Sequence, residues 1–306
     1  MEQRQIPRLR RAVSCVGFGG WQLGADWGDV SESDGIAAVE TALACGVTFI
    51  DTADVYGDGR SERLIGRVLA DHRGERPFVA TKMGRRVPLD HAEYTPARFR
   101  EWIDRSRENL GVEQLDLVQL HTPPTAVIED DALFAALDAL VEEGPIAAYG
   151  VSVETADQAL TAIARPGVAT VQIILNAFRL KPIERVLPAA LEAGVGIIAR
   201  VPLASGLLSG RYTSETTFSG VDFETGLEAV RRLAPLVPEG VTMAQWALRF
   251  VLDQPGVSVV IPGARNPEQA RANAAAAGLP PLSAEDRAAV AEVYDELIRP
   301  SVHDRW

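Results

Sequence analysis

The sequence has few cysteines and no long apolar run. Its two cysteines, Cys15 and Cys45, lie in separate apolar stretches of the 306 residues, so they form neither a metal-ligand pattern nor a disulfide framework. We expect both thiols to be reduced and buried. No apolar run approaches the roughly 18 residues that a membrane span needs, and the charged start MEQRQIPRLRRAV lacks the apolar region of a secretory signal. The sequence therefore predicts a cytoplasmic protein.

Basic residues are also in the minority. The chain has 30 Lys and Arg against 42 Asp and Glu, which gives a formal net charge of -12. Because nucleic acids and anionic membranes both attract clustered Lys and Arg, neither is an expected partner. An anionic small-molecule cofactor would need basic residues of its own.

What the sequence does contain is a regular alternation of short β-branched runs and longer segments with helical spacing. Strands that are almost wholly apolar indicate burial on both faces, and helices between them indicate parallel pairing through right-handed crossovers. The pattern favours one α/β domain over residues 1–306, a (β/α)8 TIM barrel, rather than a doubly wound sheet. The eight expected strands are 13–17, 47–51, 78–82, 115–120, 146–150, 170–174, 195–199 and 257–261.

Helices are expected between the strands, and two further segments lie outside this repeat. The clearest helical stretches are 33–45, 61–71, 96–110, 130–143 and 155–163. After the seventh strand, residues 202–223 are rich in Gly, Ser and Thr, and a loop of that length is usually a functional lid or disordered. Residues 283–297 are predicted to form an extra C-terminal amphipathic helix.

Four side chains that can take part in acid–base chemistry follow successive strands. Asp51 ends the second strand, Tyr56 lies five residues later in a Gly-containing loop, Lys82 ends the third strand and His121 ends the fourth. Because the active site of such a barrel is built at the C-terminal ends of its strands, these groups are expected to converge on one rim. Each alone has an ordinary interpretation as a solvated or structural residue. Their joint placement favours catalysis.

The four groups also make chemical sense together. A free Tyr holds its proton to about pH 10, and a nearby Lys ammonium favours the phenolate, so Lys82 would make Tyr56 a better acid. Asp51 can hold the ammonium in place, and His121 can orient a carbonyl oxygen by a hydrogen bond. A hydride donor must be a cofactor, because no side chain supplies one. The other histidines, His72, His91 and His303, lack such neighbours and are expected at the surface.

Several motifs resemble the aldo-keto reductase superfamily. In chain order they are FIDTADVYG, ATKMG, LDLVQLHTPP, YGVS, VQIILN, PLASGLLSGRY and IPGARNPEQARAN. The resemblance implies that Asp51, Tyr56, Lys82 and His121 are the catalytic tetrad, and that Tyr56 protonates a carbonyl oxygen as hydride leaves a nicotinamide. The implied reaction is the reversible NADPH-dependent reduction of an aldehyde or ketone.

The same resemblance implies where the nicotinamide is held. Gly20 and Trp21 would line its pocket, and Ser152 and Gln172 would hold its carboxamide. The family commonly has Ser-Asn where this chain has Ser-Val at 152–153, so Asn176 is the candidate for the missing amide. Arg200 replaces the family's stacking aromatic residue, and a guanidinium plane can stack on an aromatic ring.

The phosphate end of the cofactor is implied by two further segments. Because free backbone N–H groups at a helix start favour an anion, IPGARNPEQARAN suits a phosphate. Arg265 is the natural partner of an adenosine 2'-phosphate, so NADP(H) is expected rather than NAD(H). The residues implied to contact the cofactor in these two segments are Pro202, Leu203, Gly206, Leu208, Gly210, Gly263, Arg265, Gln269 and Asn273.

Other interpretations of the motifs are weaker. In GFGGWQLG the third glycine of a dinucleotide fingerprint falls on Gln22 and no helix begins there, which excludes a Rossmann fold. DTADVYGDG lacks the spacing of a calcium loop, so no metal site is expected. The alternative function is a cofactor-binding regulatory subunit, as in the potassium-channel β subunits that resemble these enzymes. The small-molecule carbonyl substrate and the oligomeric state stay open, and Trp21, Trp27, Met83, residues 207–218 and Trp306 are the expected pocket residues.

Overall fold

The computed structural model describes residues 1–24, 30–210 and 220–306. Eight parallel strands form one sheet in chain order from β3 to β10. Two single bridges, Val16 to Val260 and Gly19 to Gly263, join its first and last strands, so the predicted (β/α)8 barrel is confirmed. The strands are β3 (Phe18–Gly19), β4 (Phe49–Asp51), β5 (Phe78–Met83), β6 (Leu117–His121), β7 (Tyr149–Ser152), β8 (Val168–Ile174), β9 (Gly196–Arg200) and β10 (Val257–Val260).

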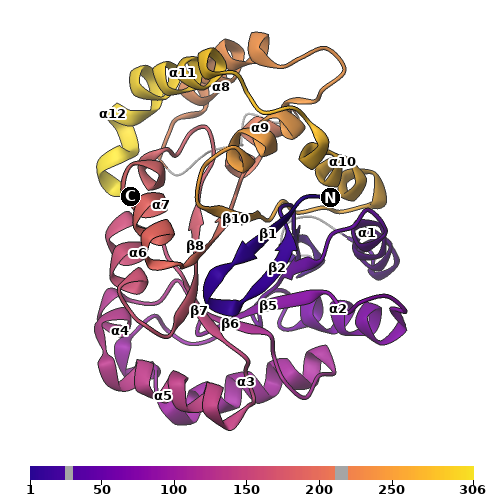
Figure 1. Ribbon diagram of the computed structural model, residues 1–306, viewed down its shortest axis with the longest axis vertical. Coiled ribbons are helices and arrows are strands. Elements are labelled where there is room, and N and C mark those ends of the chain that lie inside the picture. Colours follow the sequence, from indigo (N-terminus) through magenta and orange to yellow (C-terminus); the bar gives the residue numbers. More distant parts are fainter. Residues whose placement is uncertain (25–29, 211–219) are drawn as a thin grey trace.

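Helices surround this sheet, and two of them pack on each other at one edge of the molecule (Figure 1). Those two are α8 (Phe223–Leu233) and α11 (Ala284–Val293), of which α11 lies within the predicted C-terminal helix and continues as a π-helical turn, Tyr294–Ile298. None of the helices in the described ranges combines the length and the apolar character that a membrane crossing requires. The remaining helices are α1 (Glu32–Ala44), α2 (Arg60–Asp71), α3 (Pro96–Leu110), α4 (Thr125–Glu129), α5 (Asp131–Glu143), α6 (Ala156–Ile163), α7 (Lys181–Ala193), α9 (Met243–Leu252), α10 (Pro267–Ala275) and α12 (Arg299–Val302).

The predicted first strand, 13–17, is wrong in its bounds. Residues Arg11–Ser14 form β2, which pairs antiparallel with β1 (Gln3–Ile6) in an N-terminal hairpin outside the barrel sheet. Val13 of this hairpin is as fully buried as a barrel residue. An apolar run therefore could not distinguish a strand that covers the barrel from a strand that belongs to it.

The hairpin closes the N-terminal end of the barrel. Its Ile6 and Val13 pack in one apolar cluster with Phe49 and Phe78, the first residues of β4 and β5, and with Leu117, the first residue of β6. In Figure 1 the hairpin lies in front of the strands. The hairpin does not cover the opposite rim, where the strands end and where the predicted catalytic side chains lie.

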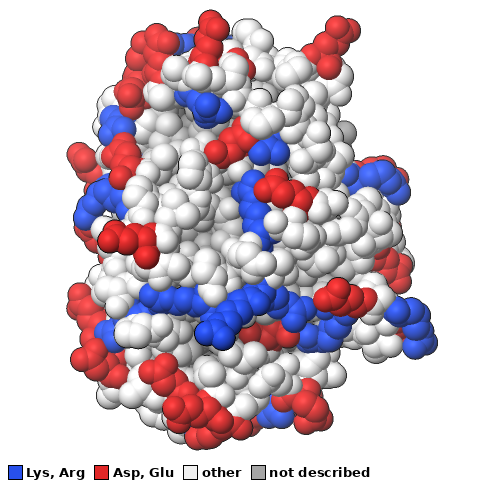
Figure 2. Space-filling view, in the orientation of Figure 1, with Lys and Arg blue, Asp and Glu red and all other residues white. Residues whose placement is uncertain are grey.

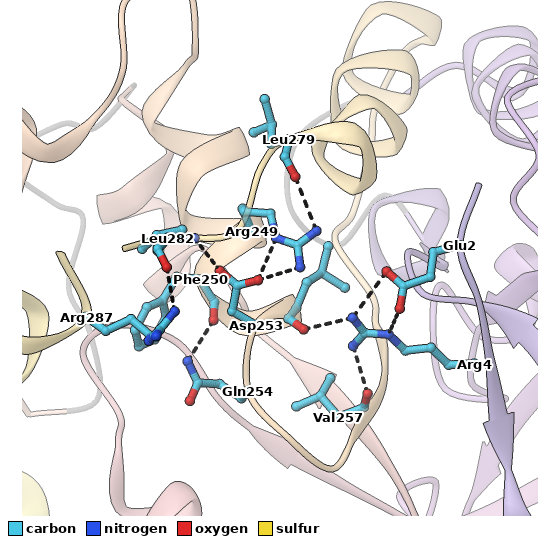
Figure 3. Close-up of polar contacts among 11 residues, drawn as sticks. Glu2, Arg4, Arg249, Phe250, Asp253, Gln254, Val257, Leu279, Leu282 and Arg287 are labelled. Carbon is cyan, nitrogen blue, oxygen red and sulfur yellow. Dashed lines mark hydrogen bonds and ion pairs between the residues drawn. The ribbon is translucent and has the colours of Figure 1, made fainter. Parts of the chain in front are cut away.

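Arginine side chains fasten the hairpin to this closed end. The Arg4 guanidinium donates to the carbonyl oxygens of Leu252 and Val257, both at 2.9 Å. It also pairs with Glu2, and Figure 3 shows Arg4 between Glu2 and Val257. Arg8 donates to the Val168 carbonyl at 2.7 Å. Figure 2 shows a band of Lys and Arg across the same face of the molecule. Arg4 and Arg8 use their charge to bind backbone carbonyls, which stabilises the hairpin on the barrel.

A few predictions about single side chains are wrong. Cys15 is buried, but Cys45 is only half-buried because it caps the end of α1. Of the three histidines expected at the surface, His91 is exposed and His72 is half-exposed. The side chain of His303 is only 12% exposed, because its Nδ1 lies 2.8 Å from the Tyr294 hydroxyl. Burial of these groups depends on packing between distant segments, which the local sequence does not report.

Candidate active site

The ends of three neighbouring strands place three of the predicted catalytic side chains. Asp51 is the last residue of β4, Lys82 lies near the end of β5, and His121 is the last residue of β6. Tyr56 follows in the loop between β4 and α2. Gly57 allows that loop to pass close to the segment before α1, because a Cβ atom there would lie 2.3 Å from the Gly24 carbonyl oxygen and its φ is +57°.

The ammonium group of Lys82 joins these elements. It donates to Asp51 Oδ1 at 2.5 Å, to the Thr52 carbonyl oxygen at 2.8 Å and to the Tyr56 hydroxyl at 3.3 Å. Each of the three N–H groups of the Lys82 ammonium thus has one acceptor, and the group has no further hydrogen to donate. Burial alone would lower the pKa of Lys82, but the charge of Asp51 and these hydrogen bonds hold that pKa above its ordinary value. Lys82 is therefore charged at neutral pH.

The ring of His121 lies edge-on to the Tyr56 ring, with centroids 5.8 Å apart. Its Nδ1 is buried and accepts no hydrogen bond from the part of the chain that the structure describes. Burial lowers the pKa of His121 well below its ordinary value, and the charges of Lys82, Arg85 and Arg200 lower it further. The imidazole is therefore neutral at pH 7 and suited to hydrogen bonding rather than to carrying charge.

Two glutamines complete the surroundings of Asp51. The amide nitrogens of Gln119 and Gln172 donate to Asp51 Oδ2 at 3.2 and 2.8 Å, and Gln172 also donates to Gln119 Oε1 at 3.1 Å. Sequence reasoning missed Gln119, although it is the one amide inside the apolar run LVQL. Gln172, which is predicted to hold a nicotinamide carboxamide, donates through its amide nitrogen to the buried carboxylate. Both glutamines stabilise the charge of Asp51, and the carboxamide contact of Gln172 stays a prediction.

Ser152 has the geometry expected of a ligand-binding hydroxyl. It ends β7 directly beside His121 in the strand register, and its Oγ is buried without a hydrogen-bond partner among the described residues. A buried hydroxyl without a partner is costly unless a ligand or water completes it. Ser152 thus fits the proposed contact with a carboxamide.

Arg200 and Asn176 are held by the protein itself. The Arg200 guanidinium donates to the Val153 carbonyl at 3.0 Å and to Glu154 Oε1 at 2.7 Å, which fixes it across the ends of β7 and β9. Asn176 donates to the Val201 carbonyl at 2.9 Å, and its Oδ1 accepts from the backbone of residue 178 at 2.8 Å. Both ends of the Asn176 amide therefore stabilise a turn, and its contact with the carboxamide stays a prediction.

The loop after β9 has unusual backbone geometry. Val201, Ala204 and Ser205 have φ values of +53°, +48° and +55°, a region that costs free energy for residues other than glycine. Of the residues predicted here to contact the cofactor, Pro202 and Leu208 are buried in the protein, Leu203 and Gly206 are half-buried, and Gly210 is exposed. Trp27 and residues 211–218 lie outside the described residues. Strain of this kind concentrates at functional sites.

At the junction of β10 and α10, the two amide side chains that are predicted to contact the cofactor make hydrogen bonds within the protein. Gln269 Oε1 accepts from the Arg265 backbone N–H at 2.9 Å, and Asn273 donates to the Gly263 carbonyl at 3.0 Å. Arg265 is exposed, and its guanidinium has no hydrogen bond or ion pair within the described ranges. Gln269 and Asn273 therefore shape the turn that presents the free guanidinium.

Two of the predicted cofactor glycines lie close to other segments of the protein. A Cβ at Gly20 would lie 2.9 Å from the Asp51 carbonyl oxygen, and a Cβ at Gly263 would lie 2.0 Å from Gln22 Oε1. The adjacent Trp21 is 41% exposed at the rim. Close approach of the Asp51 backbone accounts for Gly20, whereas the atoms near Gly263 belong to the end of the flexible Gln22 side chain, which can move.

The side chains expected to contact substrate are placed differently from one another. Met83 is 1% exposed and belongs to the core. Trp306 is 8% exposed and stacks on the Arg179 guanidinium, 4.3 Å from the ring centroid. Trp21 thus remains the exposed aromatic candidate among those that the structure describes.

Asp54, in the loop that carries Tyr56, is a feature that the sequence did not reveal. Its side chain is fully buried, and neither carboxyl oxygen has a hydrogen-bond partner in residues 1–24, 30–210 and 220–306. Burial and the nearby charge of Glu62 raise the pKa of Asp54 to about 7, and Arg86 and Arg105 offset this only in part. The loop therefore contains a carboxyl group that is half-protonated at neutral pH.

Replacement of Asp54 by Asn is expected to stabilise the protein in a pH-dependent way. Because the folded state binds the Asp54 proton more tightly than the unfolded state, the wild type loses stability as pH rises from about 4 to 7. The advantage of Asp54→Asn should thus grow by about 2–3 kcal/mol between pH 5 and pH 8. Urea unfolding at both pH values measures it, with the exposed Asp71→Asn as control. A difference that is independent of pH would contradict the prediction.

Known proteins resemble this chain over nearly its whole length. The sequence profile of the Aldo/keto reductase family matches residues 15–295. Aldo-keto reductase YhdN of Bacillus subtilis is 32% identical, over 97% of this chain and 95% of that protein. The holo form of aldo-keto reductase AKR11C1 from Bacillus halodurans has a TM-score of 0.82 at 27% identity, with 96% of each chain covered. An aldo/keto reductase from Klebsiella pneumoniae in complex with NADP and acetate has a TM-score of 0.74 at 25% identity, covering 96% of each chain.

Proposed function

The chain belongs to the aldo/keto reductase family, and on that premise we propose that it reduces an aldehyde or ketone reversibly with NADPH, with Tyr56 as the proton donor. The observation that carries this proposal is the contact of one buried ammonium, that of Lys82, with both Asp51 and the Tyr56 hydroxyl. Such a hydroxyl is poised to release its proton, because the ammonium stabilises the phenolate that remains.

The residues divide the work of carbonyl reduction between them. The Tyr56 hydroxyl transfers its proton to the carbonyl oxygen while the carbonyl carbon takes up hydride, so the product is the neutral alcohol. Lys82 stabilises the phenolate, and Asp51 keeps Lys82 charged and in place. Neutral His121 orients the carbonyl oxygen by a hydrogen bond. When bound, NADPH supplies the hydride.

Three side chains of this protein fit that cofactor. The buried Ser152 hydroxyl, which has no partner in the described part of the chain, suits a hydrogen bond to the carboxamide. The free guanidinium of Arg265 suits the adenosine 2'-phosphate, because a guanidinium binds phosphate through two parallel hydrogen bonds. Arg200, fixed by Val153 and Glu154, is the candidate for stacking against the nicotinamide ring.

Arg265 should decide between the two nicotinamide cofactors. Arg265→Gln is expected to raise the dissociation constant for NADPH about 10- to 100-fold, since a hydrogen bond to a charged group is lost, and to leave that for NADH nearly unchanged. Isothermal titration with each cofactor measures the change. Arg271→Gln is the matched control, since Arg271 is an exposed arginine on α10, the helix that follows Arg265. Near-equal dissociation constants for NADPH and NADH in the wild type would contradict the role of Arg265.

The reaction itself is tested by following NADPH absorbance with a panel of aldehydes and ketones. Turnover is the expected result. Tight NADPH binding without turnover of any carbonyl compound would instead favour a cofactor-binding regulatory subunit. That alternative draws on the departures from the family pattern at Val153 and Arg200.

A further inference from the structure

Arg85 is an arginine at the rim of the barrel that the proposed reaction does not use. It lies two residues beyond Met83, the last residue of β5, and three residues beyond Lys82. Because Met83 pairs with Leu120 in the strand register, the chain at Arg85 leaves the barrel next to the end of β6, where His121 lies. Arg85 is thus placed at the mouth of the site by the two strands that carry the catalytic groups.

The backbone before Arg85 is held in one conformation. The Tyr94 hydroxyl donates to the Gly84 carbonyl oxygen at 3.1 Å, and Tyr94 is itself buried. Gly84 has a φ of +104°, and a Cβ atom there would lie 2.8 Å from the Tyr94 ring. Only glycine fits this turn without strain. Arg85 is therefore an exposed side chain on a backbone segment that is held in one conformation.

Arg85 differs from the other arginines around the site in having no partner. Arg86 and Arg105 each pair with Asp58 at 2.8 Å, and Arg200 pairs with Glu154 at 2.7 Å. Arg85 makes no hydrogen bond or ion pair with any residue that the structure describes, although acidic residues outnumber basic ones in the chain by 42 to 30. A guanidinium left without a carboxylate in an acidic protein is available to a ligand.

The charge of Arg85 acts where the substrate must lie. Burial is the main reason why the pKa of His121 is low, and the charge of Arg85 lowers it further together with those of Lys82 and Arg200, so Arg85 lies close enough to act on the imidazole that is proposed to hold the carbonyl oxygen. The Asp51 carboxylate is already paired with Lys82, and the Glu154 carboxylate is paired with Arg200. The charge of Arg85, which no carboxylate of the described residues pairs with, can therefore attract an anion to the site.

The phosphates of the cofactor do not account for Arg85. Their proposed contacts lie after β9 and β10, whereas Arg85 follows β5. In the closed sheet, β5 is separated from β10 by β4 and β3 on one side and by β6 to β9 on the other. Arg85 therefore lies across the barrel mouth from the phosphate end of the site, and its ligand is a different anion.

We propose that the substrate is an anionic carbonyl compound, whose carboxylate or phosphate group binds Arg85 while its carbonyl group lies between Tyr56 and His121. The inference rests on the proposed function and adds the chemical class of the substrate to it. The planar guanidinium binds both kinds of anion through paired hydrogen bonds. Because this contact is distant from the reacting carbonyl, it contributes to KM more than to kcat.

Matched pairs of substrates test the proposal with NADPH as the reductant. The carboxylate pair is 4-carboxybenzaldehyde and its neutral methyl ester, and the phosphate pair is glyceraldehyde 3-phosphate and glyceraldehyde. The wild type should prefer the anionic member of at least one pair, and the preferred pair identifies the anion. In Arg85→Gln the ratio of kcat/KM for the anionic over the neutral member should fall about tenfold, through KM. Arg85→Lys keeps the positive charge but not the planar guanidinium, so it should recover part of the preference for the anionic substrate.

Arg73→Gln is the matched control, since Arg73 is exposed, has no hydrogen bond or ion pair in the described ranges, and follows α2 at its far end. It should leave the ratio unchanged. An equal ratio in wild type and Arg85→Gln, with normal turnover of neutral aldehydes, would overturn the role of Arg85 and leave the proposed function intact. Isothermal titration of 4-carboxybenzaldehyde and of glyceraldehyde 3-phosphate into the protein with NADP+ gives a second readout that needs no turnover. Binding that depends on Arg85 without any turnover would overturn the proposed function alone.

Discussion

Tyr56→Phe is expected to lower kcat by about 10²- to 10⁴-fold while the dissociation constant for NADPH changes little. The substitution removes only the hydroxyl that lies 3.3 Å from the Lys82 ammonium. Without that hydroxyl, the alkoxide that forms on hydride transfer has no acid to protonate it, because His121 is neutral and Lys82 is bound to Asp51. Steady-state kinetics with an accepted aldehyde and fluorescence titration of NADPH measure the two quantities.

Tyr149→Phe is the matched control for this experiment. Tyr149 begins β7, far along the strand from the rim, and its hydroxyl donates to Asp138 at 2.6 Å. Loss of this hydrogen bond should cost about 1 kcal/mol of stability and leave kcat unaffected. If Tyr56→Phe retained more than about a tenth of the wild-type kcat, a tyrosine proton donor would be excluded, since acid catalysis contributes at least that much.

The four candidate catalytic residues could be located from the sequence because their position depends on strand order alone. Parallel strands that are neighbours in a barrel end at the same rim, so side chains after β4, β5 and β6 had to lie close together. Recognising the apolar runs was sufficient for this, and errors of two residues in strand bounds did no harm. The structure places the Lys82 ammonium within hydrogen-bonding distance of both Asp51 and Tyr56.

The amide side chains could not be predicted in the same way. Each of four amides predicted to contact the cofactor makes a hydrogen bond to a carboxylate or to the backbone that the sequence did not reveal, and the cofactor contacts themselves stay predictions; the four are Gln172, Asn176, Gln269 and Asn273. An amide turns toward the nearest buried group that lacks a partner, and folding decides which group that is. The burial of Asp54 could not be predicted either, because a carboxylate in a polar loop is normally exposed to solvent.

Lys82→Met is expected to remove both activity and a large part of the stability. Asp51 would keep its hydrogen bonds from Gln119 and Gln172 but lose its countercharge while remaining 2% exposed. Breaking a buried ion pair from one side costs about 3–5 kcal/mol. Because the pKa of Lys82 lies above its ordinary value in the folded protein, this contribution is present at neutral pH and is lost only in alkali. Urea unfolding at pH 7 measures the loss.

The double variant Asp51→Asn with Lys82→Met separates the two roles of the pair. Removing the carboxylate as well leaves no unpaired charge in the site, so most of the stability should return, whereas turnover should not. Activity needs the ammonium beside the Tyr56 hydroxyl, and a neutral pair cannot stabilise the phenolate. Recovery of turnover together with stability would mean that Lys82 serves only to neutralise Asp51. Recovery of stability alone would assign to Lys82 a direct part in the release of the Tyr56 proton.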